Sequence, residues 1–185
     1  MRQVKKFNID LVIPLYNKKN HILRALLSAH NQKNYKFNKI ILVNDGSTDG
    51  VELDFQKFEN LFNNIEIINI ENSGVSSARN TGIDVSDATY VCFLDADDEL
   101  SEFYLEEIIF LITTYEEKKY KIFSTKHKNI FNNEDLQKIS IRKKNHYTNS
   151  NNSLFYYALD KTILCSSGIC IDRKILKEYR FPKNI

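Results

Sequence analysis

Three carboxylates stand within four positions at the end of a short apolar run. Asp95, Asp97 and Asp98 follow residues 89–94, whose β-branched, aromatic and aliphatic side chains predict a buried strand. Carboxylates this close repel one another unless a cation or protons neutralise them. Oxygen ligands suit Mg²⁺ or Mn²⁺, and an ion held here could neutralise a diphosphate. The alternative is a solvated acidic turn, in which Asp98 or Ser101 caps the following helix.

Two further predicted strands run into residues that can bind a ligand. Residues 9–13 form an apolar run that we expect Pro14 to stop, because proline cannot donate to a sheet ladder. Residues 39–43 form a second apolar run, which breaks into a turn of Asn, Asp, Gly and Ser that contains Asp45. Ligands of α/β sheets bind at the carboxyl ends of the strands, so these ends and the aspartate turn are expected at one site.

A fourth polar segment, residues 71–80, lies between the second and the last of these strands. Its Ser73-Gly74 turn predicts the start of a helix that carries Arg79 and Asn80. Arg79 offers a fixed positive charge, either for a phosphate or for the aspartates, and its structural alternative is an ion pair with Asp95. Asn80 could simply be a cap or turn residue.

Strands and helices alternate along most of the chain, which predicts a mainly parallel sheet with right-handed crossovers. Residues 126–152 are rich in Lys, Asn and His and predict a loop. The basic cluster at 142–144 could contact an anionic surface, although such clusters are more often solvated. The expected strands are 9–13, 39–43, 65–70, 89–94 and 163–171, and the expected helices are 19–30, 51–62, 74–84, 101–117, 154–159 and one from 172.

Composition excludes several classes of protein. The 26 basic and 24 acidic residues balance to +2, which argues against a nucleic-acid partner. An apolar fraction of 42% argues against disorder. The three cysteines, Cys92, Cys165 and Cys170, lack C-x-x-C spacing and predict reduced core thiols of a cytosolic protein. No signal peptide or membrane-spanning run is visible in the sequence, so a cytoplasmic location is expected.

Four motifs in order resemble those of family 2 glycosyltransferases with the GT-A fold. They are P-x-Y-N from Pro14, V-N-D-G-S-T-D around Asp45, N-x-G-x-x-x-A-R-N ending at Asn80, and F-L-D-A-D-D from Phe93. The resemblance implies an α/β, Rossmann-like, mainly parallel sheet flanked by helices, and an inverting enzyme that uses a nucleotide-diphospho-sugar. It also implies Mn²⁺ or Mg²⁺ held by Asp95 and Asp97. The donor-binding residues that it implies are Pro14, Tyr16, Asn17, Asp45, Arg79, Asp95 and Ala96.

The resemblance also gives individual roles to some of these side chains, and each role has a structural alternative. Tyr16 resembles the residue whose ring packs on the base, and its alternative role is that of a half-buried core tyrosine. Asp45 resembles the residue that accepts a hydrogen bond from uracil, and its alternative role is that of a capping or turn aspartate. Asn17 carries a weaker signal and could be a turn former.

We expect one GT-A domain over residues 1–185, with a donor-binding part at 1–120 and a partial acceptor-side part at 121–185. Residues 180–185 resemble the family segment that precedes a Glu-Asp pair, in which the acidic residue is the usual candidate for the catalytic base. The base is therefore expected beyond Ile185, and the chain is expected to be truncated at its C-terminus.

The resemblance implies a glycan, lipid-linked or polysaccharide acceptor and leaves room for peripheral contact with the inner face of the cell membrane. Two other functions stay open. One is a nucleotide-sugar-binding fragment without turnover. The other is a different metal-dependent α/β enzyme, such as a nucleotidyltransferase or a phosphatase, although the chain lacks the phosphate loop that a nucleotidyltransferase would need. The absence of G-x-G-x-x-G argues against a dinucleotide-binding dehydrogenase.

Overall fold

The computed structural model describes residues 7–115, 121–125 and 167–182, and a mixed sheet of six strands organises them. The strands are β1 (Ile9–Leu15), β2 (Lys39–Asp45), β3 (Ile65–Ile70), β4 (Tyr90–Phe93), β5 (Ile122–Ser124) and β6 (Ile169–Asp172). The helices are α1 (Lys19–His30), the 3₁₀ turn η1 (Val51–Asp54), α2 (Phe55–Leu61), α3 (Val75–Val85), α4 (Tyr104–Tyr115) and α6 (Arg173–Glu178).

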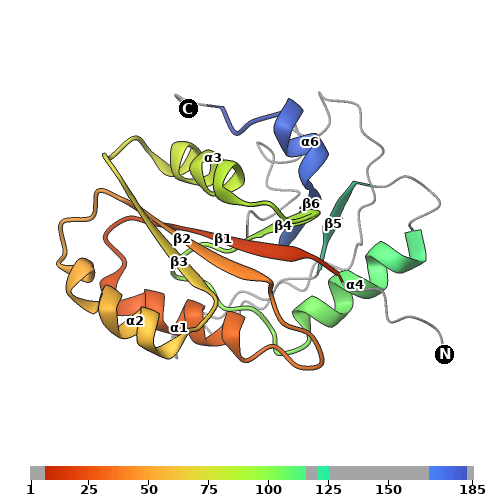
Figure 1. The fold of residues 1–185 in the computed structure, drawn as a ribbon, viewed down its shortest axis with the longest axis horizontal. Coiled ribbons are helices and arrows are strands. Elements are labelled where there is room, and N and C mark those ends of the chain that lie inside the picture. The colour runs from red at the N-terminus through yellow and green to blue at the C-terminus, as the bar shows by residue number, and fades with distance from the viewer. Residues whose placement is uncertain (1–6, 116–120, 126–166, 183–185) are drawn as a thin grey trace, which may run out of the picture.

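The strand order is β3-β2-β1-β4-β6-β5, and the first four of these strands are parallel (Figure 1). From β1 the chain moves outward to β2 and β3, and then returns to place β4 on the other side of β1. The direction of winding therefore reverses between β1 and β4. Open α/β sheets bind their ligands outside the carboxyl ends of the strands at such a reversal. The loops that follow β1 and β4 carry two of the four motifs, so the topology brings them together.

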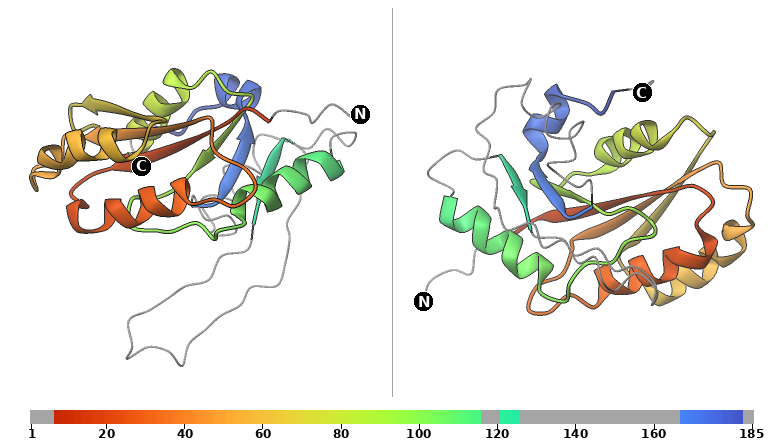
Figure 2. Two further views of the ribbon diagram at one scale, coloured as in Figure 1. Left: turned by 60° about the horizontal axis from the view of Figure 1, so that its bottom comes forward. Right: turned by 180° about the vertical axis from the view of Figure 1, so that it is seen from behind.

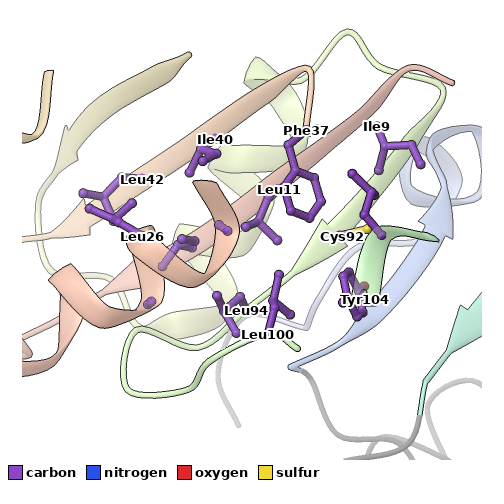
Figure 3. Close-up of a cluster of buried hydrophobic side chains, with 14 of the residues drawn as sticks. Ile9, Leu11, Leu26, Phe37, Ile40, Leu42, Cys92, Leu94, Leu100 and Tyr104 are labelled. Carbon is purple, nitrogen blue, oxygen red and sulfur yellow. The ribbon is translucent and has the colours of Figure 1, made fainter. Parts of the chain in front are cut away.

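Hydrophobic layers cover both faces of the sheet. In β1, Leu11 and Ile13 belong to the cluster that α1, α2 and α4 cover, whereas Val12 belongs to the cluster beneath α3 and α6. This alternation is the period-two pattern of a strand that is buried on both faces. Figure 2 shows the helices on the two sides of the sheet, and Figure 3 shows the larger cluster, in which Leu26 of α1 and Tyr104 of α4 meet the sheet.

Three features of the sheet differ from the sequence-based expectation. The first strand does not stop before Pro14 but continues to Leu15, with Pro14 paired to Val43 of β2. The Val12 carbonyl faces β4 and accepts from the Leu94 amide. Pro14 is two residues further along the strand, so the nitrogen that carries no hydrogen faces the same side. The β1–β4 ladder ends at the Val12–Phe93 pair, and Pro14 therefore removes a donor only beyond that end.

The remaining two differences lie at the far edge. Strand β5 was not expected from the sequence, and β6 runs antiparallel to both β4 and β5. The predicted helix 101–117 begins at Tyr104. The expected loop 126–152, the basic cluster 142–144, the expected helix 154–159, the first part of the expected strand 163–171, and Cys165 lie outside the described residues.

Several apolar side chains within the expected helices are exposed. Leu53 lies in η1, where 3₁₀ geometry replaces the expected α-helical turn and leaves the side chain 84% exposed. Leu61 and Phe103 are also exposed. Cys92 and Cys170 are buried free thiols opposite one another on β4 and β6, as expected for reduced core cysteines. Burial raises the pKa of the Cys170 thiol well above its usual range, which suits an inert packing role.

Candidate functional site

Asn17 joins the loop after β1 to the loop after β2. Its backbone amide donates to Ser47 Oγ at 3.0 Å, and its side-chain oxygen accepts from the Thr48 amide at 2.7 Å. Asn17 has φ of 51°, a left-handed conformation that asparagine tolerates better than most residues. The sequence placed Asn17 at the site as a ligand or a turn former. Its left-handed backbone is that of a turn residue, and its side chain bonds to a residue 31 positions away.

Asp45 ends β2 and is almost fully buried. Its two carboxylate oxygens accept from the backbone amides of Ser73 and Gly74, at 2.8 and 2.9 Å, just before α3 begins. These two amides precede the first turn of α3, so the structural alternative that is present is the turn aspartate and not a helix cap. A carboxylate has about four lone-pair sites, so two acceptor positions remain for another donor. Asp45 thus connects the V-N-D-G-S loop to the N-x-G turn.

Asp95 follows β4 and is held on several sides. Its Oδ1 lies 2.7 Å from Arg79 NH2, its backbone amide donates to Ser167 Oγ at 2.9 Å, and its carbonyl accepts from the Asp98 amide at 3.0 Å. The ion pair that the sequence offered as the alternative role of Arg79 is therefore formed. Ser167 lies 72 positions from Asp95, and nothing in the local sequence identified it as a partner.

Asp97 has a more exposed environment than Asp95. Lys18 Nζ lies 2.7 Å from its Oδ2, and each of these side chains is 42% exposed. The hydrogen bond from Lys18 holds the pKa of the Asp97 carboxyl below its usual range, so Asp97 is ionised at neutral pH. Lys18 was not among the residues expected at the site, because its partner is 79 positions away in sequence.

Phe181, near the C-terminal end of the described residues, packs against Arg79. The Arg79 guanidinium lies 5.3 Å from the centre of the Phe181 ring, and that ring also packs edge-on against Phe93 of β4. The Asn80 side-chain amide fixes Phe181, donating to its carbonyl at 2.9 Å and accepting from its amide at 3.0 Å. Asn80 is therefore a two-point backbone clamp rather than a helix cap.

The other expected donor-binding residues occupy different environments. Tyr16 is 47% exposed and belongs to neither hydrophobic core cluster, which argues against the core role considered as its alternative. Pro14 is buried within β1, and the Ala96 methyl group is buried in the core beneath α1 and α4. Any contact of Ala96 with a ligand would therefore use its backbone.

The carboxylates at this edge are compatible with a hard divalent ion that completes its coordination from a ligand. Within the described residues, no group of three or more His, Cys, Asp or Glu side chains is arranged to hold a metal on its own. Asp95 and Asp97 nevertheless supply two carboxylates, each with one oxygen paired to a cation in the contacts above. Mg²⁺ sites in nucleotide enzymes commonly use one or two carboxylates plus substrate phosphates, and this donor set fits that pattern.

Comparison with known proteins identifies the class that this fold and this site define. The model of the family described as Glycosyl transferase family 2 matches residues 10–180. The chain belongs to this family, which confirms the resemblance carried by the four motifs. It is 37% identical over 108 residues to the glycosyltransferase GlyA of Streptococcus pneumoniae, and 41% identical over 104 residues to the minor teichoic acid biosynthesis protein GgaA of Bacillus subtilis.

These alignments cover 58% and 54% of this chain, but only 15% of GlyA and 23% of GgaA. Among solved structures, S. aureus TarS 1-349 in complex with UDP matches 96% of this chain and 51% of its own, with a TM-score of 0.71 and 19% identity. A further structure of TarS 1-349 contains UDP-GlcNAc. The likeness to TarS confirms the expected GT-A architecture. Among the described residues, no helix has the length and apolar character needed to cross a membrane.

Proposed function

We propose that this chain binds a uridine-diphospho-sugar at the carboxyl edge of β1, β2 and β4, and takes part in transfer of the sugar to a glycan, lipid-linked or polysaccharide acceptor with inversion. The observation that carries this proposal is the meeting of all four family motifs at one sheet edge, joined by the contacts of Asn17, Asp45 and Arg79. The UDP and UDP-GlcNAc named for TarS support the choice of nucleotide.

The proposal gives the base of the nucleotide to the loops after β1 and β2. Asp45 would accept the N3–H of uracil with a lone pair that the Ser73 and Gly74 amides leave available. The exposed ring of Tyr16 would pack on the base, since an aromatic face is suited to stacking. Pro14 and Asn17 would act through the backbone path that they impose on this loop.

The diphosphate is assigned to the turn after β4. Asp95 and Asp97 would hold Mn²⁺ or Mg²⁺, which as a Lewis acid would stabilise the negative charge that develops on the leaving diphosphate. Arg79 keeps Asp95 oriented and adds a fixed positive charge behind it. The backbone at Ala96 lies between the two carboxylates, where it can approach the ligand.

The domain division and the cellular setting belong to the same proposal. Residues 1–120 would supply the donor site and residues 121–185 part of the acceptor side. The work would take place in the cytoplasm, with peripheral contact at the inner face of the membrane. Polymer biosynthesis proteins among the relatives, such as GgaA, support a polysaccharide or teichoic acid setting.

The test is release of UDP from a panel of UDP-sugars incubated with Mn²⁺, with and without candidate acceptors. The proposal predicts UDP release that EDTA abolishes and that falls in an Asp95→Asn variant. Binding of UDP-sugars without any release would support a binding module instead. Neither binding nor release with any UDP-sugar would overturn the proposal.

A further inference from the structure

Lys18 occupies a position that the local sequence rules do not favour. It is the N-cap residue of α1, where Ser, Thr, Asp and Asn are preferred, and its side chain caps no backbone amide. A cation at a helix N-terminus also opposes the helix dipole. Asp49 of the neighbouring loop caps instead, accepting from the Lys19 amide at 2.8 Å. Residues that break a local rule without a structural gain are candidates for function.

The Lys18 ammonium instead lies at the winding reversal between β1 and β4. It meets Asp97 Oδ2 at 2.7 Å, and both side chains are 42% exposed. Exposed ion pairs contribute little to stability, because water and salt screen them and the long side chains lose entropy. The contact can therefore be broken at little cost when another charged group enters.

Lys18 and Arg79 differ in their freedom to move. Arg79 pairs with Asp95 through a side chain that is 11% exposed and stacks on Phe181, so its guanidinium is fixed. Lys18 has a flexible four-carbon stem and contacts the site through one ion pair. A diphosphate that approached these carboxylates without a cation would be repelled, so a mobile positive charge here has a clear use.

We propose that Lys18 is a ligand for the diphosphate of the donor, and that its ammonium rests on Asp97 until the donor binds. This inference rests on the proposed function. If Asp97 held a divalent ion, the ammonium would lose its partner and become available to a phosphate oxygen. Lys18 would thereby neutralise part of the charge that the leaving diphosphate carries.

The test compares uridine and UDP binding by calorimetry, with Mn²⁺ present, in the wild type and in Lys18→Met, Lys18→Arg and Lys33→Met variants. Lys33 lies beyond the opposite end of α1, whose 12 residues span roughly 18 Å at 1.5 Å per residue, and its exposed pair with Glu102 makes it a matched control. Lys18→Met should weaken UDP binding roughly ten-fold or more and leave uridine binding unchanged. Lys18→Arg should keep most of the affinity, and Lys33→Met should change neither ligand.

A second measurement needs no nucleotide. Titration of Mn²⁺ alone, followed by electron paramagnetic resonance, should show tighter binding to Lys18→Met than to the wild type, because the ammonium no longer competes for Asp97. Unchanged or weaker Mn²⁺ binding would overturn the resting position on Asp97. Equal UDP affinity in Lys18→Met and the wild type would overturn the assignment of Lys18 alone. A wild type that binds neither uridine nor UDP would overturn the proposed function, and the Lys18 assignment with it.

Discussion

Asp95 and Asp97 lie two positions apart, yet the protein holds them in different ways. Asp95 is fixed through its carboxylate by Arg79, through its amide by Ser167 and through its carbonyl by Asp98. The Asp97 carboxylate pairs with the Lys18 side chain, and both of these side chains are 42% exposed. In the proposed metal site, Asp95 would therefore be the ligand held in a fixed orientation, and Asp97 the ligand that becomes available when its ion pair with Lys18 breaks.

The Asp97→Ala variant tests this division. We expect it to weaken UDP binding in the presence of Mn²⁺ by about ten-fold or more, because a charged ligand of the diphosphate-bound ion is lost. Titration of UDP with and without Mn²⁺ measures the effect. Asp98→Ala is the matched control, since it removes an adjacent exposed carboxylate without an assigned role. Unchanged, still metal-dependent affinity in Asp97→Ala would show that the metal binds elsewhere.

Replacement of Asp45 is expected to affect the binding of uridine as well as that of UDP. Asp45→Ala should weaken uridine and UDP together, because the proposed contact is to the base, and the loss of a charged hydrogen bond of roughly 1.5–3 kcal/mol corresponds to about ten-fold or more. Asp49→Ala is the control, since Asp49 lies in the same loop and also accepts from two backbone amides, those of Lys19 and Val51. Loss of UDP binding with intact uridine binding would place Asp45 at the phosphates instead.

Part of the candidate site could be predicted from the sequence, because some of its residues are identified by their spacing in a short segment. We could propose Asp45, Asp95 and Asp97 as ligand-binding residues, because each follows an apolar run that predicts a strand, and α/β sheets bind ligands at the carboxyl ends of their strands. Lys18 and Ser167 could not be proposed, since their roles depend on contacts that span 79 and 72 positions. Only the fold brings such partners together.

Helix α3 links the donor edge to the sheet and to the C-terminal part of the described chain. Gly82 packs so closely on β1 that a Cβ atom there would lie 2.4 Å from Val12 Cγ1. We therefore expect Gly82→Ala to lower the free energy of unfolding by about 1–3 kcal/mol through overpacking, measured by urea denaturation. Val12→Ala in the same chain should recover part of the loss. A Gly82→Ala protein as stable as the wild type would contradict this close approach.

The Asn80 clamp gives a second prediction for this helix. Asn80→Ala should lower the free energy of unfolding by about 1–3 kcal/mol, because it leaves the amide and carbonyl of Phe181 without their partner. Asn60→Ala, on the exposed face of α2, is the control and should change stability little. Equal urea midpoints for the two variants would mean that the clamp contributes nothing.

Elements were predictable from the sequence to different degrees. Strands β2 and β3 follow from apolar runs of ordinary length, and the start of β1 follows in the same way. Strand β5 has three residues, too few for any period to show. A short apolar run carries no sign of direction, so the antiparallel orientation of β6 could not be predicted. Leu53 shows that an apolar residue within an expected helix need not face the core.

At the scale of the whole molecule, the winding reversal explains why four separated motifs form one site. The motifs after β1 and β4 meet because these strands are neighbours, and the motif after β2 joins them through Asn17. The N-x-G turn then reaches the same edge through Asp45. Each motif is weak evidence alone, but a fold that brings all four together makes a single nucleotide-diphosphate site the simplest account.

The most direct test of that account is calorimetric titration of the wild-type chain with UDP, GDP and UDP-sugars, each with and without Mn²⁺. The account predicts saturable binding of UDP and of at least one UDP-sugar, strengthened by Mn²⁺, with GDP bound more weakly because Asp45 is assigned to uracil. Preference for GDP, or UDP binding that Mn²⁺ does not change, would contradict the base or metal assignment respectively. Absence of binding by every nucleotide in the panel would contradict the central claim that this sheet edge is a donor site.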